Sequence, residues 1–293
     1  MGRVLSATDV ARYWDQGYLA PVRVMDEAAA TAHHARLDSY IAAKAGGADE
    51  EALHHKLLRF KPHLISTWLN DLVRTPAILD CIEDLIGPDI LVWSSAFFIK
   101  RERDPGFITY HQDSITYQLD GDELVSAWLA LSPSVVANGC VRVLPKSHAL
   151  GELPHHDTWA ENNRLSRGEV VDYAVDETKV ADLVLRPGEM SLHHIRLIHG
   201  SNPNPTGTAR IGYAIRYLSP RCRARGATES AMLVRGQDTL GHFEHEPSPS
   251  ADFAPLAIAA YDRAMAIRTA RTFAGTDSDR KVKEGEFAGA TRT

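Results

Sequence analysis

Between residues 89 and 220 the chain alternates short hydrophobic runs with tight-turn signals, and this alternation limits the fold more than any other sequence feature. The runs are rich in β-branched and aromatic residues, as strands are. Gly, Pro, Asn and Asp cluster between them, for example at 104–106 and 202–205. Many short strands joined by tight turns predict a sandwich or barrel. The expected strands are 90–99, 107–111, 124–131, 141–144, 182–185, 190–194 and 209–217.

Helical patterns flank this β-rich segment on both sides. Ser6 is a suitable N-cap for a helix that Gly17 ends, and Thr75-Pro76 opens another helix, while residues 251–273 return to helix. We therefore predict a single domain over residues 1–293. Its parts are a helical N-terminal support (1–88), a β core (89–220), a C-terminal strand and helix segment (221–274) and a flexible tail (275–293).

Charge and composition argue against several classes of partner. The formal net charge is −6 and no basic stripe is present, so we expect no nucleic-acid partner. No run of about 20 apolar residues exists, and the first residues lack the apolar stretch of a signal peptide. The three cysteines match neither a disulfide framework nor a zinc site. We expect a cytoplasmic protein without a membrane partner, and its oligomeric state stays open.

Three side chains form a candidate metal site. His111 and Asp113 lie two positions apart in an expected strand, and such residues point to the same side. His199 follows 86 positions after Asp113. Two imidazoles and one carboxylate are the facial triad of non-haem iron(II) oxygenases, which leaves coordination positions open for other ligands. His193 faces the side of His199 by strand alternation, and we expect it to be buried and hydrogen-bonded rather than to be a further ligand.

Two arginines follow on the next expected strand. Arg210 lies 11 residues after His199, so a hairpin would bring its guanidinium beside the metal. Arginine is suited to bind a carboxylate through two hydrogen bonds, and Ser201 could donate a third. Arg216 shares the face of Arg210 because six residues is an even offset. It is the alternative clamp, an ion-pair partner or a substrate contact.

These motifs occur in the order seen in one enzyme family. The segment from about 101 to 220 resembles the phytanoyl-CoA dioxygenase family of iron(II) and 2-oxoglutarate-dependent oxygenases. The opening residues 15–19 also resemble the start of that family. The matching residues are His111-Gln112-Asp113 with Tyr117, the runs 125–131 and 138–148, and His199-Gly200-Ser201 with Arg210 and Arg216.

The resemblance implies a mainly β fold with flanking helices and a double-stranded β-helix (jelly-roll, cupin-like) core. It also implies Fe(II) ligands at His111, Asp113 and His199, and a clamp for 2-oxoglutarate at Arg210. The cosubstrate pocket would be lined by Gln112, Trp128 and Ser201.

The family's usual reaction is hydroxylation of an unactivated C–H bond of a small molecule, with O2 and 2-oxoglutarate consumed and succinate and CO2 released. The substrate would be an amino acid, an acyl conjugate or a specialised metabolite. Because Asp113 is retained, the resemblance argues against halogenation, for which relatives replace this carboxylate.

Other residues are candidates for contacts with ligands. Tyr110 is assigned to the cosubstrate and Tyr117 to the substrate, with simple packing as the alternative for both. Residues 151–172 form a long polar segment with little strand signal, which predicts a lid. Arg164 and Arg167 on this segment could contact an anionic substrate group.

Three alternatives stay open at this point. The same site could desaturate, epoxidise or close rings in natural-product biosynthesis. A jelly-roll protein could bind ligands without catalysis. A metal-dependent hydrolase or isomerase could use the same triad without 2-oxoglutarate.

Overall fold

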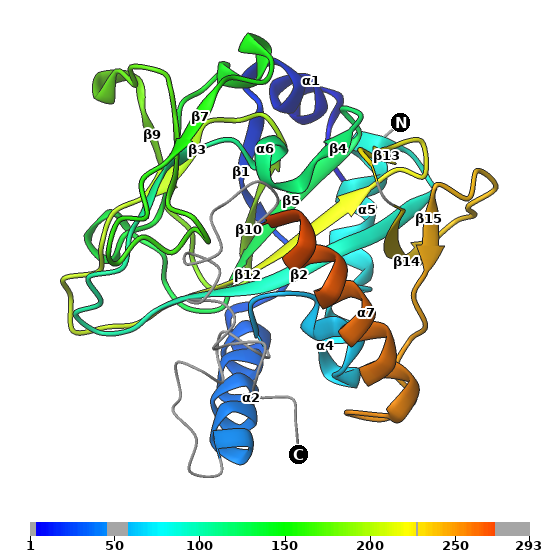
Figure 1. Ribbon diagram of the computed structural model, residues 1–293. Coiled ribbons are helices and arrows are strands. Elements are labelled where there is room, and N and C mark those ends of the chain that lie inside the picture. Colours follow the sequence, from blue (N-terminus) through cyan, green and yellow to red (C-terminus); the bar gives the residue numbers. More distant parts are fainter. Residues whose placement is uncertain (1–3, 46–57, 227, 273–293) are drawn as a thin grey trace.

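Two β-sheets form the centre of the computed structural model, which describes residues 4–45, 58–226 and 228–272 (Figure 1). Both sheets are antiparallel except for one parallel pair at an edge of the larger sheet. The expected mainly β fold with flanking helices is thus confirmed. The larger sheet has the order β1 (Tyr18–Arg23), β10 (Glu189–His194), β5 (Leu124–Ala130), β12 (Arg210–Leu218), β2 (Ile90–Lys100), β14 (Glu229–Arg235), β15 (Phe243–His245). The smaller sheet has the order β3 (Ile108–His111), β11 (His199–Ser201), β6 (Val141–Val143), β9 (Ala181–Leu183).

Helices from residues 7–86 pack against the outer face of the larger sheet (Figure 1). Alternate residues of β12, such as Ile211 and Tyr213, belong to the same buried cluster as Trp68 and Ile82 from the helical layer. The opposite face of β12 points to the smaller sheet, and every residue of this strand is buried. The helices are α1 (Ala7–Gln16), α2 (Glu27–Ala45), α4 (Thr67–Leu72), α5 (Pro76–Ile86), α6 (Asp113–Tyr117) and α7 (Pro255–Thr272), with short 3-10 turns at Pro62–Leu64, Val136–Asn138, Ser147–Leu150 and Glu177–Lys179.

The predicted helix boundaries near the N-terminus are confirmed. The Ser6 hydroxyl accepts a hydrogen bond from the backbone N–H of Asp9, and Gly17 ends α1 with φ of 80°. The expectation that residues 1–88 are helical throughout is wrong, however, because β1 pairs with β10 at the edge of the larger sheet. Leu19 is the one buried residue of β1, as fits a strand at the edge of a sheet. The predicted tail at 275–293 lies outside the described residues.

The segment 151–172 is not a structureless lid. It contains a two-stranded hairpin formed by β7 (His155–Asp157) and β8 (Glu169–Val171), and β8 lies against β3. A second small pair joins β4 (Leu119–Asp120) to β13 (Arg223–Ala224). In the hairpin, backbone N–H and C=O groups of β7 and β8 form hydrogen bonds with each other instead of with water. A polar sequence can therefore adopt this conformation.

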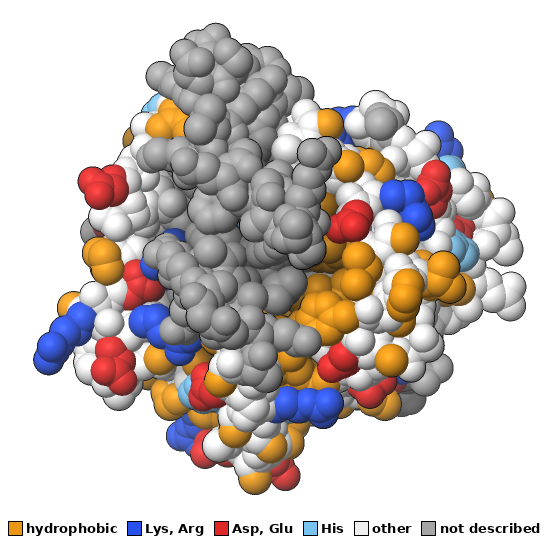
Figure 2. Space-filling view, turned by 60° about the horizontal axis from the view of Figure 1, so that its bottom comes forward, with side chains coloured by type: hydrophobic (Ala, Val, Ile, Leu, Met, Phe, Trp, Pro, Cys, Tyr) orange, Lys and Arg blue, Asp and Glu red, His pale blue; other side chains and the backbone are white. Residues whose placement is uncertain are grey.

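The face shown in Figure 2 carries acidic and basic side chains interspersed among its described residues. Hydrophobic side chains gather at the centre of this face beside the grey region. Among the residues that the structure describes, no helix has both the length and the apolar character needed to cross a membrane.

Gly212 on β12 is required for the packing of Trp128. A Cβ atom at Gly212 would lie 1.9 Å from a carbon of the Trp128 ring, so the ring would have to move. We expect Gly212→Ala to lower the free energy of unfolding by about 1–3 kcal/mol, measured by chemical denaturation. Gly207→Ala is the control, because nothing lies within 4 Å of that position. Equal stability of the two variants would contradict this account.

Candidate metal centre and its pocket

The three predicted ligands meet where the smaller sheet ends. His111 is the last residue of β3, and His199, the first residue of β11, pairs directly with it. Asp113 does not continue the strand, as the sequence had suggested, but opens the short helix α6. Gln112 keeps an extended backbone between them (φ −112°, ψ 133°), so the carboxylate still turns toward the imidazole of His111.

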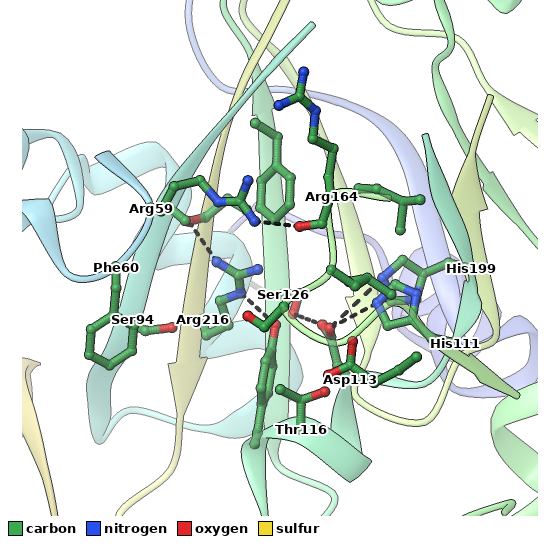
Figure 3. Close-up of a pocket in the computed structure, with 18 of the residues that line it drawn as sticks. Arg59, Phe60, Ser94, His111, Asp113, Thr116, Ser126, Arg164, His199 and Arg216 are labelled. Atoms are coloured by element: carbon green, nitrogen blue, oxygen red, sulfur yellow. Dashed lines mark hydrogen bonds and ion pairs between the residues drawn. The ribbon is translucent and has the colours of Figure 1, made fainter. Parts of the chain in front are cut away.

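The donor atoms of these three side chains all lie within 4.8 Å of one another. The Asp113 Oδ1 atom is 3.6 Å from Nε2 of His111 and 3.9 Å from Nε2 of His199. Figure 3 shows the two imidazoles and the carboxylate pointing toward one another. One divalent cation with nitrogen and oxygen ligands fits this donor set.

Hydrogen bonds select the nitrogen that each imidazole presents. The Nδ1 atom of His111 lies 2.9 Å from the carbonyl oxygen of Thr109, and Nδ1 of His199 lies 2.9 Å from that of Leu197. A carbonyl oxygen only accepts, so Nδ1 donates and Nε2 keeps its lone pair for a metal. The Ser126 hydroxyl donates to Oδ2 of Asp113 at 3.2 Å, which leaves Oδ1 toward the imidazoles.

Electrostatics favour the deprotonated ligands. Burial would raise the pKa of Asp113, but the hydrogen bond with His111 and the nearby positive charges hold that pKa well below its usual range. Burial, followed by the charge of His111, lowers the pKa of His199 to about 4. Burial alone would lower the pKa of His111, yet its contact with Asp113 raises it. A metal ion would therefore compete mainly with the proton on His111.

A pocket between the two sheets begins at these ligands. Arg210, Trp128 and Ser201 line it, as the sequence predicts for residues near the cosubstrate. Arg210 is only 1% exposed, and its guanidinium carbon lies 5.1 Å from the centre of the Trp128 ring. Its Nε atom has no hydrogen-bond partner within the described parts of the chain. A buried cation that faces a cavity in this way is suited to an anionic ligand.

Lys100 does not line the pocket itself, but it contacts the lining residue Ser201 and was missed by sequence reasoning. It pairs with Arg210 across β2 and β12, and its Nζ atom donates to Ser201 Oγ at 2.7 Å and to the carbonyl of Asn202. Burial and the charge of Arg210 lower the pKa of Lys100 to about 6. The sequence feature that could have identified Lys100 is its position directly after the apolar run 90–99.

Two residues assigned to the cosubstrate face elsewhere. Gln112 is fully buried, and its side-chain amide donates to the carbonyls of Gly151 and Arg196 and accepts from the N–H of Leu153. Tyr110 alternates with His111 and lines a separate surface hollow beside β8. Neither lines the pocket at the metal ligands, so their prediction as cosubstrate contacts is corrected.

The predicted substrate contacts divide into two groups. Tyr117 and Arg216 line the pocket, and Arg216 Nε donates to the Tyr117 hydroxyl at 2.8 Å. Arg164 reaches the pocket edge, but its guanidinium binds Asp104 at 2.8 Å and points away from the metal ligands in Figure 3. Arg167 does not line the pocket.

Arg167 pairs with Asp157 and Glu169 within the hairpin. The prediction that Arg164 and Arg167 meet the substrate is therefore corrected, because neighbouring carboxylates hold both guanidinium groups. His193 also lines the pocket, buried and with its ring centre 5.9 Å from that of His199.

Comparison with known proteins identifies relatives. The family model described as "Phytanoyl-CoA dioxygenase (PhyH)" matches residues 13–212. A Stutzerimonas stutzeri protein named "Probable alpha-ketoglutarate-dependent hypophosphite dioxygenase" is 32% identical over 63% of this chain and 67% of its own length. The human peroxisomal phytanoyl-CoA dioxygenase is 32% identical over 50% of this chain, which spans about half (45%) of that relative.

Solved structures show the same arrangement of the backbone. The structure titled "non-heme monooxygenase; ThoJ apo" is 33% identical, covers 94% of this chain and 99% of its own, and has a TM-score of 0.80. "CytC3 with Fe(II) and alpha-ketoglutarate", 21% identical over 87% of this chain and 98% of its own, has a TM-score of 0.63 and shows the shared fold.

Asp113→Asn removes the only carboxylate of the candidate triad. We expect it to lower the affinity for Fe(II), titrated under argon, on the order of 100-fold, because loss of residues that merely orient ligands costs roughly 10–100-fold. The affinity of the unaltered protein should also fall as the pH drops through the raised pKa of His111. Asp172→Asn, which alters an exposed carboxylate paired with His156, is the matched control. Unchanged iron binding in Asp113→Asn would rule out this centre.

Proposed function

Because the chain belongs to the phytanoyl-CoA dioxygenase family and is a 2-oxoglutarate-dependent non-haem iron dioxygenase, we propose that it hydroxylates an unactivated C–H bond of a small molecule. Succinate and CO2 are the coproducts. The observation that carries this proposal is the convergence of two imidazoles and a carboxylate beside a buried arginine in one pocket. This combination meets the needs of a metal and of a dicarboxylate at once.

Each group in the pocket has a distinct part in this proposal. His111, Asp113 and His199 hold Fe(II), which when bound supplies the activation of O2 for C–H oxidation. Arg210 binds the remote carboxylate of 2-oxoglutarate, and the Trp128 ring fixes the guanidinium plane. Ser201 lies beside it and completes the clamp.

The site serves other oxidative outcomes equally well in principle. Desaturation, epoxidation and ring closure begin with the same hydrogen abstraction, and no contact in the pocket favours one of them over hydroxylation. The candidate substrates remain an amino acid, an acyl conjugate or a specialised metabolite. A cytoplasmic location and the absence of nucleic-acid and membrane partners stay predictions.

The function is tested first by anaerobic addition of Fe(II) and 2-oxoglutarate. We expect a weak visible charge-transfer band for the wild type and a loss of 2-oxoglutarate affinity of at least about tenfold in Arg210→Gln, since one charged hydrogen-bond pair is worth about 1.5–3 kcal/mol. Arg142→Gln is the control, because Arg142 pairs with Asp182 and Glu177 and does not line the pocket. A wild type without the band would refute the proposal.

A substrate screen then separates the oxidative outcomes. Succinate formation is followed together with the mass of the product. A gain of one oxygen supports hydroxylation, whereas a loss of two hydrogens supports desaturation or ring closure. Turnover of substrate without succinate would exclude this reaction class.

Lys100 should make cosubstrate binding depend on pH. Its pKa of about 6 leaves it mostly neutral at pH 7.5 without ligand, and a carboxylate bound at the neighbouring Arg210 would favour the charged form. Binding should then take up close to one proton, and affinity should fall as the pH rises above about 6. Calorimetry in two buffers of different ionisation enthalpy measures this uptake, and Lys100→Met should abolish it. Equal proton uptake in both proteins would contradict the assignment.

A further inference from the structure

Positive charge is concentrated in the pocket although the chain as a whole is acidic. Six arginines but only three acidic side chains line the pocket, whereas the chain has 32 Lys and Arg against 38 Asp and Glu. Two of these arginines are neutralised locally: Arg164 pairs with Asp104, and Arg271 pairs with Glu229. Arg210 faces the cosubstrate in the proposed function. Among the rest, Arg216 is the most deeply placed, since only 8% of it is exposed.

The surroundings of Arg216 hold its guanidinium in place without neutralising it. The guanidinium carbon lies 5.4 Å from the centre of the Phe98 ring and 5.6 Å from that of Tyr117. Its Nε atom donates to the Tyr117 hydroxyl, and Nη1 makes a long contact of 3.5 Å with the carbonyl of Ala214. No carboxylate of the described residues forms an ion pair with Arg216. Two aromatic faces and a hydroxyl therefore orient the Arg216 guanidinium.

Strand register surrounds Arg216 with polar groups that also face the pocket. Arg216 pairs with Ser94 on β2 and with Ser126 on β5, and Ser126 pairs in turn with His193 on β10. All four side chains line the pocket, so they form one polar row across four adjacent strands. Figure 3 shows Arg216 between Ser94 and Ser126. Oxygen atoms of a bound anion would find the Ser94 hydroxyl as a donor beside the guanidinium, whereas the Ser126 hydroxyl already donates to Asp113.

The two pocket arginines of β12 are well separated. Arg210 and Arg216 lie six residues apart on one strand face, which corresponds to about 20 Å along the backbone. Of the residues between them on that face, Ala214 lines the pocket, whereas the space beside Gly212 is filled by the Trp128 ring. A dicarboxylate held at Arg210 would thus leave Arg216 for a different ligand.

Charge balance points to the nature of that ligand. A divalent cation, the Asp113 carboxylate and a dicarboxylate sum to one negative charge, which Arg210 balances even before Lys100 takes up a proton. Arg216 then remains as a buried positive charge, which is costly without an anion. We propose, on the premise of the proposed function, that the substrate carries an oxyanion, a carboxylate or a phosphonate-type group, and that Arg216 binds it.

The test uses the protein loaded with Ni(II) and saturating 2-oxoglutarate, so that binding is measured without turnover. The probes are hexanoate, hexylphosphonate and the uncharged hexanamide, each followed by calorimetry. We expect the preferred anion to bind the wild type at least tenfold more tightly than hexanamide. In Arg216→Gln this preference should vanish while hexanamide affinity stays the same. The comparison of hexanoate with hexylphosphonate identifies which oxyanion the site takes.

Two further variants separate anion binding from a general structural role of Arg216. Arg164→Gln, another pocket arginine but one paired with Asp104, should keep the full anion preference. Arg216→Lys keeps the charge without the fork of donors and should recover part of the preference, and it decides the question if Arg216→Gln does not fold.

Several results would overturn the proposal. They are equal affinities for anions and hexanamide in the wild type, an undiminished preference in Arg216→Gln, or a loss of Ni(II) and 2-oxoglutarate binding in a folded Arg216→Gln. Absence of the Fe(II) and 2-oxoglutarate charge-transfer band in the wild type would instead refute the proposed function. The two failures are therefore distinguishable.

Discussion

The pairing of His199 with His111 across β11 and β3 is the constraint on which the rest of the site depends. A shift of this register by one residue would turn one imidazole to the opposite face of the sheet. With the register as it is, the ring centres lie 4.3 Å apart, and each Nδ1 atom is held by a carbonyl two residues earlier. Asp113 needs only one extended residue to join them. Backbone pairing in the smaller sheet therefore places both imidazoles, and α6 adds the carboxylate.

The larger sheet supplies the space and the charges around that geometry. β12 carries two sets of residues with a period of two: Ile211 and Tyr213 pack against the helical layer, while Arg210 and Arg216 face the pocket. Helix packing on one face thus stabilises the strand that orients the cations on the other. Gly212 lies on the same strand face as Arg210. Its missing side chain leaves room for the Trp128 ring, over which the Arg210 guanidinium lies.

Features encoded by local spacing could be predicted from the sequence, and features that depend on register between distant segments could not. The triad and Arg210 follow from short motifs in an ordered set. Lys100 was missed because its partner Ser201 lies far away in the sequence. Only the folded sheets bring the end of β2 close to β11. Gln112 was misassigned for a related reason, since its partners Gly151 and Arg196 belong to two loops that meet only in the folded protein.

The charges of the pocket connect stability to ligand binding. Arg210 and Lys100 lie on adjacent strands, and burial together with the charge of Arg210 drives Lys100 toward its neutral form. Arg216 stays charged and buried, held by aromatic faces rather than by a carboxylate. Buried cations without counter-ions weaken a fold. The presence of Arg210 and Arg216 on one strand face is therefore explained if a bound anion pairs with each of them during function. His111, Asp113 and His199 line the same pocket as both arginines, so a dicarboxylate at Arg210 and an anionic substrate at Arg216 would share one cavity with the metal site.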